Sequence, residues 1–416
     1  MEYKQPTIEQ RISATLATTR KAKDVDKAES SRMTFPAPLV LSGDDLANDP
    51  KHPRQSLRQW LRLEDRNEVT TEKNVIYVVP PPGEVKFMEG WNQPKIDGPV
   101  INKPRFDEVV GYITAFYHGI KVKTLSRTHE NLCFTEWADE RPRKRTKTKT
   151  STPRYIGLNT SKECIGIRSR PSVDGIYPAQ LNLDDLLDAA ISILPEDAYA
   201  LLLLVDHDLY EDDEDLFVCG RAYGGSRVAV VSTARYHPGL DNTQDVERDH
   251  AWPASHCELY IENHSKNAEG SSTKKKTKEI PITQSPLAVD SPLNAALKAH
   301  VSIPSLTSKS APSGLTGLWL GRVCRTASHE LGHCFGMEHC VYYACSMQGS
   351  SSLSEDDRQP PYLCPVDLSK MLHASGASAE ERYRVVLRFC ERHEGSVHLF
   401  SAYAAWIRQH LVTNYL

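Results

Sequence analysis

One run of the chain, from 329 to 347, constrains the fold more than any other segment. It contains His329 and His333, which lie four residues apart and therefore project from one face of a helix, one above the other. Two imidazoles placed in this way can share one metal ion. Glu330 follows the first histidine and points to the side of that face, where its carboxylate is a candidate general base and not a ligand. The spacing therefore predicts a helix that carries a metal site.

A third histidine, His339, completes the candidate ligand set. In a continuous helix it would lie about 9 Å further along the axis, so the helix has to end and the chain has to fold back. Gly336, between the second and third histidines, is the residue type that adopts the left-handed conformation of such a turn. Three neutral imidazoles leave zinc with its full charge and an open position, which lowers the pKa of bound water. The sequence therefore predicts a catalytic zinc site.

The complete pattern, HExxHxxGxxH followed by Met347, is the signature of the metzincin metallopeptidases. Met347 is expected beneath the three histidines as an apolar floor, and an ordinary core methionine would look the same in the sequence. Three cysteines are interleaved with or follow this signature: Cys340, Cys345 and Cys364. With them the segment resembles the archaemetzincin family, whose extended motif adds four cysteines that hold a second, structural zinc. The resemblance implies a zinc peptidase with two zinc ions per chain.

The chain departs from the family pattern at the fourth ligand of this second site, where Asp367 replaces cysteine. Aspartate carries the same unit charge as a thiolate and is an accepted zinc ligand, so three cysteines and one aspartate can form a zinc site. His373, six residues further on, is the other candidate for the fourth ligand. A disulfide between two of the cysteines is a third interpretation, which requires an oxidising compartment.

Hydrophobic patterning predicts an α/β fold. Strand, helix and strand follow one another from residue 75, as in a parallel crossover unit. Strands are expected at 75–79, 120–125, 199–205, 216–222 and 228–236, and helices at 106–116 and 183–194, the latter capped by Asn182. The run 199–205 is apolar throughout, as expected of a strand in the middle of a sheet. By the same resemblance, the strand 228–236, or its end, is expected to be an exposed edge that pairs with an extended peptide substrate.

The predicted architecture is a metzincin-like domain over residues 73–416, with a mixed twisted sheet, a zinc helix and a helical C-terminal part. The zinc helix is expected from 313–316 to 335, followed by helices at 367–372, 380–391 and 397–411. Residues 1–72 show little periodicity, apart from the pattern of a short helix near 55–63, and are predicted to be extended or partly disordered. Two further segments, a basic run at 139–155 and a polar stretch at 239–305, are predicted to be mobile inserts.

Composition bears on partners and compartment. The formal charge of −4 argues against nucleic acid as the main partner, and the apolar run 198–205 is too short to cross a bilayer. Ten cysteines in 416 residues are too sparse for a disulfide scaffold. Since the first residues lack a secretory pattern, we expect a cytoplasmic protein. We also expect it to be a monomer. A nuclear-import signal within 139–155 is an alternative to a plain solvated loop.

The predicted function is zinc-dependent hydrolysis of peptide bonds in a peptide or protein substrate. Two alternatives remain open: a zinc protein that binds peptides or a partner without turnover, and a nucleic-acid-associated zinc module. The second would use the basic runs at 141–149 and 274–278 and would bind in a salt-dependent manner. The enzyme is favoured because the non-ligand Glu330 has little purpose in a structural zinc site.

Overall fold

The computed structural model describes residues 3–17, 34–98, 100–125, 132–137, 152–256, 291–307 and 310–415. The chain divides into two compact units, and it passes from one to the other four times. The first unit contains Met1–Glu64, Asp241–Gly321 and Met337–Leu416, and the second contains Asp65–Leu240 and Arg322–Gly336. This division differs from the predicted lead at 1–72 and single domain at 73–416, because segments far apart in the sequence share each unit.

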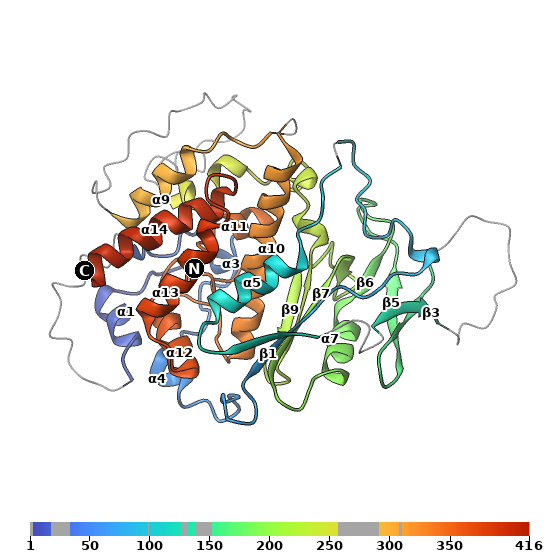
Figure 1. The fold of residues 1–416 in the computed structure, drawn as a ribbon, viewed down its shortest axis with the longest axis horizontal. Helices are drawn as coiled ribbons and strands as arrows, with labels where there is room; N and C mark the ends of the chain where they lie inside the picture. Colours follow the sequence, from blue (N-terminus) through green and yellow to red (C-terminus); the bar gives the residue numbers. More distant parts are fainter. Residues whose placement is uncertain are drawn as a thin grey trace, which may run out of the picture. The chain divides into compact units, whose positions relative to one another are not determined.

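A five-stranded mixed sheet is the centre of the second unit, with the order β2-β1-β7-β10-β9 (Figure 1). Its strands are β1 (Val75–Val79), β2 (Lys121–Thr124), β7 (Ala198–Val205), β9 (Gly220–Tyr223) and β10 (Val228–Ser232). Neighbouring strands are parallel except for β9, which runs antiparallel to β10. All eight residues of β7 are buried, which confirms the prediction of a strand in the middle of the sheet.

The prediction that the strand beginning at residue 228 is an edge strand is wrong for β10. β10 pairs with β7 on one side and with β9 on the other, so the edge strands of this sheet are β9 and, on the far side, β2. The reason is the turn at Gly224 and Gly225, which reverses the chain and lays β9 outside β10. The strand predicted from residue 216 begins only at Gly220, because Val218 forms an isolated bridge with Leu209 instead.

Two helices of this unit were predicted, α5 (Phe106–Phe116) and α7 (Leu183–Ser192). The side chain of Asn182 caps α7 by accepting a hydrogen bond from the backbone N–H of Asp185 at 3.2 Å. The apolar face of α7 joins the core of the sheet, where Leu186 packs in one cluster with Leu203 and Val230. Both helix predictions are confirmed, and the mixed α/β class with them.

A second sheet, not predicted, has the order β3-β4-β5-β6-β8. Its strands are β3 (Cys133–Glu136), β4 (Tyr155–Asn159), β5 (Cys164–Arg170), β6 (Gln180–Asn182) and β8 (Asp208–Tyr210). Most of the predicted basic insert, residues 139–151, lies outside the described residues, and its last residue, Tyr155, begins β4. Short strands with polar outward residues lack the long apolar runs that make a buried strand recognisable in a sequence.

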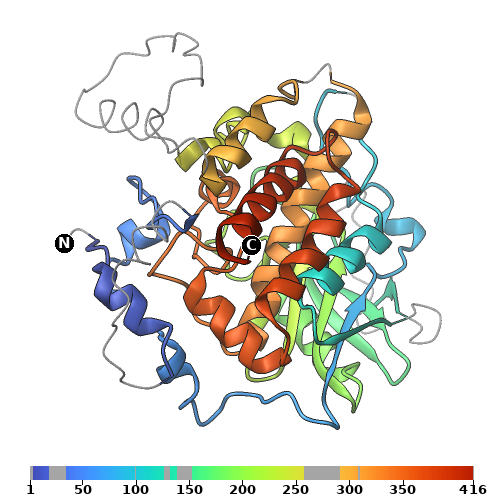
Figure 2. The same cartoon turned by 60° about the vertical axis from the view of Figure 1, so that its left-hand side comes forward.

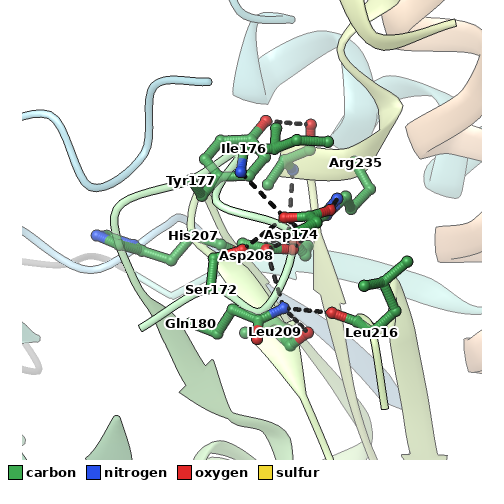
Figure 3. A network of polar contacts seen from close by, with 12 residues as sticks. Ser172, Asp174, Ile176, Tyr177, Gln180, His207, Asp208, Leu209, Leu216 and Arg235 are labelled. Atoms are coloured by element: carbon green, nitrogen blue, oxygen red, sulfur yellow. Dashed lines mark hydrogen bonds and ion pairs between the residues drawn. The ribbon is translucent and has the colours of Figure 1, made fainter. Parts of the chain in front are cut away.

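A buried ion-pair network connects this sheet to the segment that follows β10 (Figure 3). Arg235 donates from Nε to Asp208 at 2.7 Å and from Nη1 to Asp174 at 2.6 Å. The side chain of Gln180 donates to Asp208 at 3.0 Å and to the carbonyl oxygen of Leu216 at 2.7 Å. Because the side chain of Arg235 is fully buried, both carboxylates are needed to compensate its charge.

The described part of the first unit begins with three short helices. The one near 55–63 was predicted, whereas the prediction of an extended lead over the rest of residues 1–72 is corrected for its described part. The three helices are α1 (Ile8–Ala14), α3 (Asp45–Asn48) and α4 (Leu57–Trp60). Thr7 and Ser56 start α1 and α4 with reciprocal capping hydrogen bonds. Leu46 and Trp60 are each 1% exposed, so the segment has its own buried anchors.

Phe35, in the same N-terminal part, packs among aromatic side chains from the other end of the chain. Its ring centroid lies 5.4 Å from those of Tyr362 and Trp406 and 5.6 Å from that of His410. Tyr3 donates a hydrogen bond to the carbonyl oxygen of Val341 at 2.6 Å. The N-terminal segment is therefore part of the core of the first unit.

The remaining helices of the first unit are C-terminal, apart from α9. They are α9 (Pro292–Val301), α11 (Leu353–Arg358), α12 (Pro365–Ser375), α13 (Ala379–Glu391) and α14 (His398–Tyr415). The last three confirm the predicted C-terminal helices, and α9, in orange, packs along α14, in dark red (Figure 2). The predicted insert 239–305 contains α9 and two short 3-10 helices, Arg248–His250 and Ala254–His256, whereas its residues 257–290 lie outside the described part.

Three other single-turn 3-10 helices lie in the second unit, at Lys86–Met88, Ala234–Tyr236 and Pro238–Leu240. Within the described ranges, no helix is both long and apolar enough to cross a membrane.

Candidate metal centres

The helix α10 (Pro312–Cys334) carries the first two candidate ligands, close to the predicted bounds. It stops where the sequence predicted: Gly336 has a positive φ of 72°, and its backbone N–H donates to the carbonyl oxygen of His333 at 2.9 Å. A side chain at this position would be strained, because L-residues rarely adopt such a φ. The stop returns the chain from the helix axis before His339.

The end of α10 is fixed by the β9–β10 turn and by β7. A Cβ atom on Gly224 would lie 2.6 Å from the carbonyl oxygen of His333, so only glycine permits this approach. Asn67 donates to the carbonyl oxygen of Gly224 at 3.0 Å. Tyr199 of β7 donates to the carbonyl oxygen of Cys334 at 3.4 Å. These contacts, which the sequence did not reveal, determine where the helix presents His333.

The three predicted histidines lie close together, within one continuous stretch of the chain. One nitrogen from each of His329, His333 and His339 can be chosen so that all lie within 4.8 Å of one another. The Nε2 atoms of His329 and His333 are 3.1 Å apart, and the two rings are inclined at 81°. Two nitrogens bound to one tetrahedral zinc are about 3.3 Å apart, given Zn–N bonds of about 2.0–2.1 Å. The donor set therefore fits a zinc ion.

Glu330 and Met347 are both buried beside this set. Glu330 is 8% exposed. Burial raises the pKa of the Cys334 thiol, and the charge of Glu330 adds to this rise. Met347 is fully buried, and its carbonyl oxygen accepts a hydrogen bond from the backbone N–H of Cys340 at 2.7 Å. The methionine turn is thereby fastened to the residue that follows His339.

A second cluster brings together Cys340, Cys345, Cys364 and Asp367, all of them buried and with ligand atoms within 4.8 Å of one another. The Sγ atoms of Cys340 and Cys364 are 3.6 Å apart, and Oδ2 of Asp367 is 3.3 Å from Sγ of Cys364. These separations match two thiolates on one tetrahedral zinc, about 3.8 Å apart, and a thiolate with a carboxylate, about 3.5 Å apart. A disulfide would require about 2.05 Å. The donor set thus suits zinc.

Of the two candidates for the fourth ligand, only Asp367 lies in this cluster. The ring of His373 instead packs edge-on against Trp60 of α4, with 5.8 Å between the ring centroids. Asp367 is close to the thiols because Cys364 precedes the first turn of α12, which brings the residue three positions later back over the same end of the helix.

Lys370 is a further residue of this centre, and the sequence analysis missed it. Lys370 is 1% exposed. Its ammonium group donates to Oδ1 of Asp367 at 2.8 Å and to Oε1 of Gln55 at 2.7 Å. Burial, followed by the charge of Cys340, raises the pKa of Asp367 to about 6, whereas Lys370 lowers it. Lys370 could have been found in the sequence from its spacing of three residues from Asp367. Nothing in the sequence indicates that Gln55 is close to this cluster.

The segment that contains both clusters is similar in sequence to known proteins. Residues 305–372 match the family model described as peptidase family M54. Archaemetzincin-2 of Rattus norvegicus is 26% identical over 356 residues, which cover 86% of this chain and 74% of that protein. Archaemetzincin-2 of Homo sapiens is 32% identical over 218 residues, covering 52% and 48% respectively.

A similarity among solved structures was also found. The crystal structure of archaemetzincin from Methanopyrus kandleri aligns with 74% of this chain and 98% of its own, at 18% identity and a TM-score of 0.33. Because superposition at this level is weak, the assignment rests on the sequence relationships and the motif.

The histidine motif and the sequence relatives define a zinc-dependent metallopeptidase. Within that class, the matching family model and the sequence relatives support the archaemetzincin family.

Proposed function

We propose that the chain hydrolyses peptide bonds with a zinc ion held by His329, His333 and His339. The 3.1 Å separation of the Nε2 atoms of His329 and His333 is the observation that carries this proposal, since it fits two ligands of one ion. When bound, zinc supplies Lewis-acid polarisation of the substrate carbonyl and of a water molecule.

Glu330 is the proposed general base. Its backbone position next to His329 on α10 is rigid, and its carboxylate is largely removed from solvent. It takes a proton from the attacking water and returns it to the leaving amine. No ligand role is needed for it, because the three histidines already provide the protein ligands of an open zinc site.

Substitution Glu330→Gln tests this role, because the amide keeps the size of the side chain but cannot accept the proton. The zinc content should stay that of the wild type, and cleavage of a diverse peptide library should fall at least about 10²-fold. Equal cleavage by the variant and the wild type would refute the mechanism. If the wild type binds zinc but cleaves no peptide in the library, the alternative of a zinc protein without turnover is correct.

The substrate is proposed to be an extended peptide that pairs with β9. Among the residues that the structure describes, this strand lies at the edge of its sheet, so no described strand pairs with one row of its backbone N–H and C=O groups. Pairing of this kind provides affinity through main-chain hydrogen bonds and little side-chain specificity.

The second cluster is proposed to hold a structural zinc through Cys340, Cys345, Cys364 and Asp367. Its ligands fasten the chain directly after His339 to the start of α12, which stabilises the loop that carries the third histidine. We expect two zinc ions per chain by elemental analysis. Cys340, Cys345 and Cys364 are present as thiols and not as disulfides, which suits the reducing cytoplasm in which we propose that the protein acts.

A further inference from the structure

Asp45, on the short helix α3, lies beside the third candidate ligand. Its Oδ2 atom is 3.9 Å from Nδ1 of His339. Histidines that bind a metal through one ring nitrogen usually direct the other towards a carboxylate, a carbonyl or a water molecule. We propose that Asp45 is a positioning residue that orients the imidazole of His339 for zinc, an inference that rests on the proposed function.

The backbone around Asp45 is held independently of its carboxylate. The backbone N–H of Asp45 donates to Oε2 of Glu355 on α11 at 2.9 Å. The neighbouring Asp44 accepts from Nη2 of Arg358, also on α11, at 2.6 Å. Leu46 is buried next to them. Since these contacts fix α3, the side chain of Asp45 is free to act on His339.

Space for this contact is left by a glycine. A Cβ atom on Gly349 would collide with the carboxylate of Asp45 and would lie 2.7 Å from Nδ1 of His339. On another side, the ring of His52 lies 5.5 Å from that of His339, measured between centroids. His339 is therefore flanked by two side chains of the N-terminal segment and by the backbone at Gly349.

The distance of 3.9 Å decides how the contact works. It exceeds the 2.7–3.2 Å or so of a direct hydrogen bond, so the carboxylate acts through its charge or through a bridging water. A negative charge facing Nδ1 favours the tautomer with the proton on that nitrogen. The lone pair of Nε2 is then available for the metal, as it is in His329 and His333.

Gln55 adds a second contact from the same segment. Its Oε1 atom accepts a hydrogen bond from the backbone N–H of Glu338, the residue before His339, at 3.1 Å. The same oxygen accepts from Lys370 in the cysteine cluster. The N-terminal segment therefore holds both the backbone and the ring of the third histidine.

The test uses the full chain with Asp45→Ala and Asp45→Asn, and measures zinc affinity by competition with a chelator. One of the two zinc ions should bind about 10- to 100-fold more weakly in Asp45→Ala, with a smaller loss in Asp45→Asn, which keeps an acceptor oxygen. Glu64→Gln is the matched control. It removes the same charge from an exposed side chain of the same N-terminal segment, and both affinities should be unchanged.

Three results would overturn the proposal. Unchanged zinc affinity in Asp45→Ala would show that the carboxylate does not orient His339. Faster cleavage by this variant would show that Asp45 competes with the substrate for the metal. Equal weakening of both zinc sites, with a lower thermal midpoint, would show a purely structural role. Failure of the proposed function is seen separately: a His329→Ala variant would then bind as much zinc as the wild type.

Discussion

At the scale of single residues, the pair Asp367 and Lys370 explains how this chain replaces a cysteine of the family pattern. A carboxylate has two oxygens, and here one faces the thiols while the other accepts from Lys370. A cysteine has a single ligand atom and would leave the buried ammonium group with Gln55 alone. Aspartate and lysine therefore form a unit, because a buried charge is costly without its partner.

Replacing the two members of this pair should have different effects. Asp367→Ala removes a ligand and leaves Lys370 uncompensated, so one zinc ion should be lost and the free energy of unfolding should fall by about 3–5 kcal/mol. Lys370→Met should retain both zinc ions and cost less. Elemental analysis and denaturant unfolding measure both effects. Two zinc ions in Asp367→Ala would contradict the role of Asp367 as a ligand.

Glu355 gives a pH-dependent prediction. Burial, opposed by the backbone N–H groups of Ser351 and Asp45 among others, raises the pKa of Glu355 to about 7 from an ordinary value of 4.5. The folded state then holds this proton more tightly than the unfolded state. Its contribution to stability is complete below the unfolded pKa and is lost as the pH rises through about 7.

Glu355→Gln removes this titration. The difference in free energy of unfolding between variant and wild type should shift in favour of the variant by about 1–3 kcal/mol between about pH 5 and about pH 8. Parallel denaturant titrations at the two pH values measure it. A difference that is independent of pH would mean that Glu355 has an ordinary pKa in the folded protein.

At the scale of secondary-structure elements, the β9–β10 turn and the end of α10 act as one unit. Gly224→Ala would push a methyl group against the carbonyl oxygen of His333. We expect a loss of about 1–3 kcal/mol in the free energy of unfolding, together with slower peptide cleavage because His333 is displaced. Gly225→Ala is the control, since its Cβ would have no atom within 4 Å. Equal effects of both substitutions would show that the close approach is unimportant.

Long elements could be predicted because their own periodicity specifies them. The helices α5, α7 and α10 and the strand β7 have the predicted type and nearly the predicted bounds. The position of β9 at the edge could not be predicted, since strand order depends on pairing between distant segments. The helices α1 and α3, of seven and four residues, depend mainly on tertiary packing and leave little pattern in the sequence.

The same distinction applies to the site. The candidate zinc ligands from His329 to Asp367 were predictable because they are close in the sequence and their spacing carries the geometry. Asp45 and Gln55 were not, because they meet their partners only through contacts across about 300 residues, such as the separation of 315 between Gln55 and Lys370. A single sequence contains no sign of such pairs.

At the scale of the whole molecule, the chain order and the spatial order differ. The first unit is made of the two ends of the chain and one middle segment, and the second unit is made of what lies between them. A prediction that divides the chain once, at residue 72, cannot describe this arrangement. The metal centres make the difference important, because residues 34–64 contribute contacts to the candidate ligands of both.

The hydrogen bond from Tyr3 to Val341 joins residues separated by 338 positions. A ribosome that adds about 5–20 residues per second makes the second partner roughly 20–70 s after the first. Throughout that interval Phe35 lacks the aromatic neighbours that bury it. The early part of the chain therefore cannot complete its packing until the C-terminal part has been synthesised.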